Sequence, residues 1–283
     1  MFVRNAVLVI PAFCAMAAFA DPTPTPTATS SAPASSAAGN PLSPEQMGQA
    51  IKLDEITIPT PGELFAALAD TAKTDWGSVY RGPAAINYKS RAQIALNLGG
   101  LIADGFIAVE AQDTQQVKNI GADIVKMAKG LGVSESILAR GNSINQFAEN
   151  DEWATLQEEL EATQNEVKAS MQTHRDQDLI ILVSLGGWIR GTQVVSGLVA
   201  KNYDEKLGQI LRQPQLLRFI RSKIRQMTPE MQNDPLVKKV DTQLGGIEPI
   251  VATTFGRGLS VDEVKKLNAS VNALVQEIQR KEK

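Results

Sequence analysis

The sequence predicts an all-α fold, a multi-helix bundle of about nine helices packed around two central apolar helices. Three observations indicate this class. Helix-capping motifs recur along the chain, apolar residues follow them at spacings of three and four, and two longer segments are apolar nearly all round. No stretch shows the alternation of apolar and polar residues that is typical of a strand.

The start of the chain carries the parts of a secretory signal. Arg4 is the only charge before an apolar run that ends in Ala18-Phe19-Ala20. Because this run is shorter than the roughly 20 residues of a comfortable membrane span, cleavage after Ala20 is favoured over an uncleaved anchor. We therefore expect residues 1–20 to be a signal peptide and the protein to be exported, either to the periplasm or outside the cell.

A Pro-, Thr- and Ser-rich stretch follows the signal. Residues 21–41 read DPTPTPTATSSAPASSAAGNP, with one charge and no large apolar side chain. Such a segment favours extended, polyproline II-like backbone and cannot bury enough surface to offset the entropy of ordering. The sequence therefore predicts a disordered tether over residues 21–41 and a helical domain over residues 42–283.

Within that domain, helix starts and helix faces are both readable. Ser43, Thr60 and Ser260 are each followed three residues later by Glu or Gln, the spacing of a capping box. Apolar stripes at helical spacing then occupy residues 117–128, 153–171 and 264–278. The last stripe is a narrow seam, as at the edge of a coiled coil.

The two predicted central helices span residues 94–109 and 179–200. Helices that are apolar on every side belong inside a bundle or inside a membrane. The second is long enough to cross a bilayer, but Arg190 lies at its centre, where a charge costs about 2.5–3.5 kcal/mol on insertion scales. We therefore expect both segments to be buried core helices.

These two helices resemble each other. Residues 94–102 align with residues 181–189 at a constant offset of 87, and further apolar matches follow at the same offset. An ancient duplication of a helix pair would explain this, although the abundance of Leu, Ile and Gly makes chance the competing explanation.

Paired glycines mark the middle of both helices. Glycine in a helix interior costs about 0.5–1 kcal/mol relative to alanine, so its presence predicts a compensating close contact. We expect close helix packing at these glycines, with Gly100 and Gly187 at the crossing; the alternative is the floor of a groove for a ligand or partner helix. The glycines concerned are Gly99, Gly100, Gly186, Gly187 and Gly191.

Each central helix also carries a charge that needs a partner. Asp104 follows Gly100 by one turn, and Arg190 follows Gly187 by three residues. A buried carboxylate or guanidinium is costly when it is unpaired. We therefore expect a buried ion pair between Asp104 and Arg190.

Residues for catalysis or metal binding are nearly absent. The chain has one histidine, His174, and one cysteine, Cys14, whereas a zinc site needs three or four such ligands. No phosphate-binding glycine loop or nucleophile elbow occurs. We therefore predict no catalytic, cofactor-binding or metal-binding residues and no cofactor, although about thirty carboxylates leave acid–base hydrolysis open.

One predicted helix has a basic edge. Arg218, Arg221 and Arg225 lie at spacings of three and four beside an apolar stripe. This pattern is typical of helices that bind anionic surfaces. The alternative, which we favour, is a helix docked on the core whose basic edge is solvated or paired with the acidic residues at 151–161.

With 28 Lys+Arg against 31 Asp+Glu the chain is too balanced for a nucleic-acid binder. The sequence best fits an exported, non-catalytic helical binding or scaffolding protein of the cell envelope, whose partner is an unidentified protein or envelope component. The main alternative is a module that binds anionic lipid or polymer at a membrane surface through the three arginines. A hydrolase built on carboxylates is the weakest alternative.

Overall fold

The computed structural model describes residues 60–69, 74–82, 85–173, 176–252 and 256–280, and the fold is given for these. All of their regular structure is helical and none of it is strand, which confirms the predicted all-α bundle. The expected signal peptide, residues 1–20, and the tether, residues 21–41, lie outside the described residues, as do Ser43 and His174.

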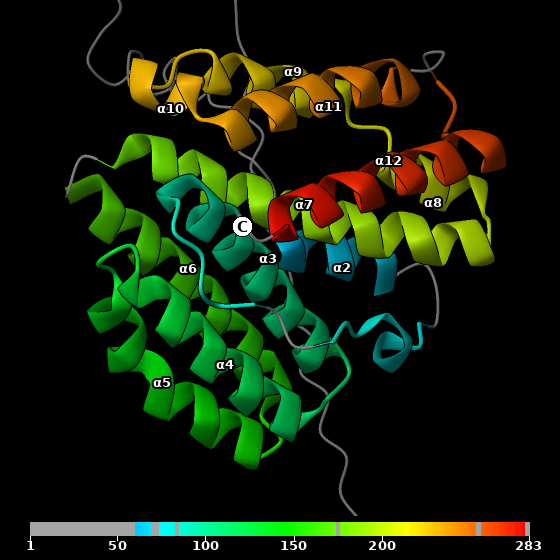
Figure 1. The fold of residues 1–283 in the computed structure, drawn as a ribbon. Helices are drawn as coiled ribbons and strands as arrows, with labels where there is room; N and C mark the ends of the chain where they lie inside the picture. Colours follow the sequence, from blue (N-terminus) through cyan, green and yellow to red (C-terminus); the bar gives the residue numbers. More distant parts are fainter. Residues whose placement is uncertain (1–59, 70–73, 83–84, 174–175, 253–255, 281–283) are drawn as a thin grey trace, which may run out of the picture. The chain divides into compact units, whose positions relative to one another are not determined.

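Figure 1 shows the helices in chain order. They are α2 (Pro61–Ala69), the short 3-10 helix η1 (Trp76–Val79), α3 (Arg91–Glu110), α4 (Thr114–Lys129), α5 (Ser134–Glu149), α6 (Trp153–Thr173), α7 (Gln177–Lys201), α8 (Glu205–Ile210), α9 (Pro214–Ile224), α10 (Pro229–Asn233), α11 (Pro235–Val251) and α12 (Val261–Gln279). The described part contains more helices than the nine expected, because short capped turns such as α8 and α10 separate the longer ones.

Helices α3 and α7 pack against each other at the centre. Helices α4, α5 and α6 cover α3, whereas α9, α11 and α12 lie on the other side, next to α7 (Figure 1). Both central helices are long and apolar enough to span a membrane, but 89% and 78% of their apolar windows are buried inside the fold. This burial is what core helices require.

The two central helices cross in van der Waals contact of their backbones. A Cβ atom on Gly99 would lie 1.9 Å from the carbonyl oxygen of Val183, and one on Gly186 would lie 2.0 Å from that of Leu96. The contact is reciprocal, because Gly99 corresponds to Gly186 and Leu96 to Val183 at the offset of 87. The other matches at that offset place residues of α4 and α5 on the short helices α8 and α9.

The closest approach is at Gly99 and Gly186, and Gly187 also belongs to the crossing, since a Cβ atom on Gly99 would lie 2.7 Å from its backbone nitrogen. Gly100 instead faces the Arg81 guanidinium, and Gly187 faces Pro61 of α2 besides the carbonyl of Gly99. Gly191 contacts Leu64 of α2, so the Gly187-x-x-x-Gly191 edge receives α2.

Capping and seam predictions are confirmed where they can be seen. The Ser260 backbone N–H donates to Glu263 Oε2 at 2.7 Å, the Glu263 N–H donates back to the hydroxyl, and Thr60 and Glu63 form the same reciprocal pair. The apolar seam of α12 is buried: Val264, Leu267, Val271, Leu274 and Ile278.

Helix α11 continues to Val251 with Pro249 inside it. Gly245 in its interior faces Arg221, and a Cβ atom there would lie 3.0 Å from the guanidinium.

Candidate functional site

Two hollows on either side of the α3–α4 contact form the candidate site, and a buried charge cluster lies beside one of them. The structure brings Asp104 and Arg190 together: Arg190 Nε donates to Asp104 Oδ1 at 2.8 Å. The remaining nitrogens of Arg190 donate to Gln193 Oε1 at 2.7 Å and to the backbone carbonyl of Val79 at 2.8 Å. Each of the three guanidinium nitrogens of Arg190 therefore donates a hydrogen bond.

Arg81, which precedes α3, is a second partner of Asp104. Its Nε donates to Asp104 Oδ2 at 2.6 Å, and its Nη2 also contacts that oxygen. The missing side chain at Gly100 leaves the space in which this guanidinium lies. Burial lowers the pKa of Arg190; the Asp104 charge opposes this and the Arg81 charge adds to it. Two cations therefore share one carboxylate, which leaves a net positive charge.

A polar cleft of about 440 Å³ opens beside this cluster, between the η1–α3 segment and α4. Arg81 is the more accessible of the two arginines, with 21% of its side chain exposed against 6% for Arg190. Lys126 and Asp123 on α4 also line the cleft and form an ion pair at 3.1 Å. The cleft therefore presents the unbalanced charge of the cluster through Arg81.

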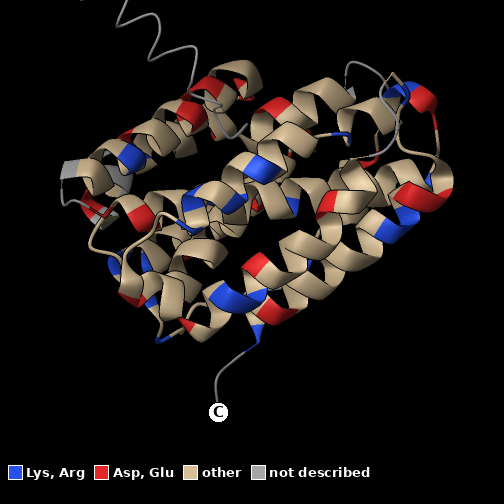
Figure 2. Cartoon of the chain, turned by 90° about the horizontal axis from the view of Figure 1, so that it is seen from above, with Lys and Arg blue, Asp and Glu red and all other residues tan. Residues whose placement is uncertain are grey.

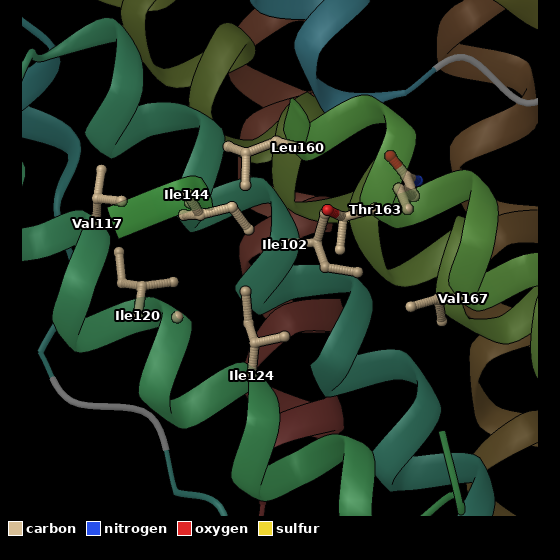
Figure 3. Close-up of a pocket in the computed structure, with 11 residues that line it drawn as sticks. Ile102, Val117, Ile120, Ile124, Ile144, Leu160, Thr163 and Val167 are labelled. Atoms are coloured by element: carbon tan, nitrogen blue, oxygen red, sulfur yellow. The ribbon is translucent and has the colours of Figure 1, made fainter. Parts of the chain in front are cut away.

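An apolar cavity of about 50 Å³ lies between α3, α4, α5 and α6 (Figure 3). Figure 3 shows Val117, Ile120 and Ile124 of α4 facing Ile102 and Leu160 across it. Its lining residues are Ile102, Gly105, Val117, Ile120, Gly121, Ile124, Ile144, Leu160, Thr163, Gln164 and Val167. Glycines on α3 and α4 contribute to the space, since neither fills the gap with a side chain.

One polar group in that lining is unpaired. Gln164 is 5% exposed, and its Oε1 is buried with no hydrogen-bond partner among the described residues. The neighbouring hydroxyl of Thr163 is satisfied, because it donates to the Glu159 carbonyl at 2.7 Å. Because Gln164 Oε1 has almost no accessible surface, it lies behind the cavity wall and is not presented to a group inside the cavity. Sequence reasoning missed it, since nothing in the pattern marks one glutamine of an amphipathic helix.

The predicted basic edge lies on α9 but is largely used within the fold. Arg221 donates to Asp241 at 2.9 Å and to Glu248 at 2.7 Å, both on α11. Arg218 also reaches Glu248, at 3.3 Å, and Arg225 is exposed. The acidic partners come from α11, and not from residues 151–161 as the favoured alternative had suggested. Acidic and basic residues are interspersed along the helices in the view from above (Figure 2).

Another cleft, of about 900 Å³, is lined by several carboxylates. Three of these have structural partners. Asp176 pairs with Arg91 at 3.0 Å, Asp178 accepts from Thr228, and Asp234 caps the start of α11. Among the described residues, no group of three His, Cys, Asp or Glu side chains could hold a metal ion. The cleft thus lacks a free pair of facing carboxylates of the kind that acid–base hydrolysis uses.

No protein-family model matches the chain, and comparison with curated proteins and with solved structures gives no match either.

Proposed function

We propose that the chain is a non-catalytic, exported binding protein whose helical part takes a small apolar ligand. The observation that carries this proposal is the apolar cavity between α3, α4, α5 and α6. An unfilled gap forfeits dispersion contacts between the side chains that line it. A ligand that fills the cavity restores such contacts.

Filling the cavity from within is expected to abolish binding without harming the fold. Gly121 lines the cavity on α4, and a Cβ atom there would meet no atom within 4 Å. The variant Gly121→Leu should therefore gain up to about 1 kcal/mol of stability from helix propensity. It should also lose binding of octanol, which is used as the uncharged apolar probe and followed by isothermal titration calorimetry.

Gly246→Leu is the matched control. Gly246 lies on α11 away from the cavity, and a Cβ atom there likewise meets nothing within 4 Å. This variant should gain similar stability and keep octanol binding. If the full chain does not bind octanol, or if both variants bind it equally, the proposed function is wrong.

Export is supported by residues 1–20, and residues 21–41 would hold the helical part clear of its attachment point. Cleavage after Ala20 predicts that N-terminal sequencing of the exported protein begins at Asp21. Recovery of chains that still begin at Met1 in the membrane fraction would contradict this and favour an uncleaved anchor.

A further inference from the structure

The polar cleft and the apolar cavity share one wall. Ile120 of α4 lines both hollows. Across from it, Gly105 of α3 is so close that a Cβ atom would lie 3.8 Å from Ile120 Cγ2. On α3 the two hollows are lined by neighbouring residues, Asp104 towards the cleft and Gly105 towards the cavity. Ile120 therefore lies between the polar cleft, which is beside the charge cluster, and the apolar cavity.

The charge cluster beside the cleft favours an anion. Arg190 and Arg81 share Asp104, so one positive charge is uncompensated within this cluster, and Lys126 is already paired with Asp123. Arg81 turns Nε and Nη2 to the carboxylate, and no described residue accepts a hydrogen bond from its Nη1. Arg81 lines the cleft with 21% of its side chain exposed, and a guanidinium binds carboxylates by charge-assisted hydrogen bonds.

The dimensions of the two hollows limit the shape of the ligand. The cleft, at about 440 Å³, falls within the size range of small-molecule sites, which is about 300–1,000 Å³. The cavity, at about 50 Å³, is much smaller than the apolar cavity of about 150 Å³ that accommodates benzene. A ring does not fit, whereas the narrow end of an alkyl chain does.

We propose that the ligand is a single-chain anionic amphiphile, with its carboxylate at Arg81 and its alkyl chain passing Ile120 into the apolar cavity. This inference rests on the proposed function, because it assigns the ligand class of the same cavity. It extends the site across the α3–α4 contact, so that one ligand contacts both hollows. Ile120 then packs against the middle of the bound chain.

The test compares three probes by isothermal titration calorimetry on the full chain. Octanoate has both the charge and the chain, octanol has the chain without the charge, and butyrate has the charge with a short chain. Octanoate should bind at least about tenfold more tightly than either of the others, since a hydrogen bond to a charged group and the apolar burial each contribute. Apolar burial should also give a negative heat-capacity change.

Variants of Arg81 then test whether this residue binds the carboxylate of the ligand. Arg81→Gln should reduce octanoate binding to the level of octanol, whereas Arg81→Lys keeps the positive charge and should keep part of the preference. Arg91→Gln is the matched control, because Arg91 pairs with Asp176 at the other end of α3 and does not line the cleft. Thermal unfolding followed by circular dichroism verifies that each variant is folded.

The outcomes separate this inference from the proposed function. Two outcomes would show that Arg81 does not bind the carboxylate: octanol binds as tightly as octanoate, or folded Arg81→Gln still binds octanoate more tightly than octanol. The further inference is then wrong, and only the proposed apolar site remains. If octanoate binds but Gly121→Leu leaves its affinity unchanged, the chain does not enter the cavity and the inference is overturned. If neither octanoate nor octanol binds, both proposals fail.

Discussion

Replacing Gly99 or Gly186 by alanine is expected to prevent the native packing of the two central helices. The added methyl group would lie 1.9 or 2.0 Å from a backbone oxygen of the opposite helix. A backbone atom inside a helix cannot turn away as the end of a side chain can, so α3 and α7 must separate. We expect a loss above the range of about 1–3 kcal/mol that is usual for overpacking, because that separation disturbs the whole core.

The measurement is the free energy of unfolding by denaturant, with two graded controls. Gly100→Ala places its methyl group 3.3 Å from the Arg81 guanidinium, a side chain that can shift, so the loss should be small. Gly246→Ala meets nothing within 4 Å and should gain about 0.5–1 kcal/mol. Equal stabilities for Gly99→Ala and Gly100→Ala would show that the backbones do not cross at Gly99.

The helix crossing shows which part of the packing can be predicted from the sequence and which part cannot. Paired glycines and an internal likeness predicted that the two central helices pack closely, and they do. The sequence analysis expected Gly100 close to the crossing, but Gly99 makes the closest contact, and a shift of one residue turns a helix face by about 100°. A helical wheel groups polar positions, but which edge meets the partner depends on α2 and Arg81, whose places follow only from the fold.

The candidate site likewise has contacts that the sequence predicts and contacts that it does not. The contact of Asp104 with Arg190 could be expected, because two buried charges of opposite sign in adjacent core helices need each other. The second contact of Asp104, with Arg81, could not be expected, since Arg81 lies outside any helix and 23 residues from Asp104. The apolar cavity is unfilled volume, which depends on how four helices pack and leaves no pattern in the chain. The partners of Arg221 on α11 are likewise a product of tertiary packing.

The second large effect is expected from removing the charge of Asp104. In Asp104→Asn the guanidinium of Arg190 keeps its burial, with 6% of the side chain exposed, but loses its counter-charge. Breaking a buried ion pair from one side costs about 3–5 kcal/mol, since the remaining charge is uncompensated. Arg81 is more exposed and remains partly hydrated, so most of the loss should come from Arg190.

A double variant that also replaces Arg190 tests this explanation by unfolding free energies. Asp104→Leu combined with Arg190→Met removes both charges and should recover much of the loss, because apolar replacement of a buried pair is often neutral or stabilising. The control is Asp123→Asn, which removes the more exposed pair with Lys126 and should cost at most about 1 kcal/mol. If Asp104→Asn costs no more than this control, Arg190 does not depend on Asp104 for compensation. If the double variant is less stable than Asp104→Asn alone, the guanidinium is held mainly by Gln193 and the Val79 carbonyl.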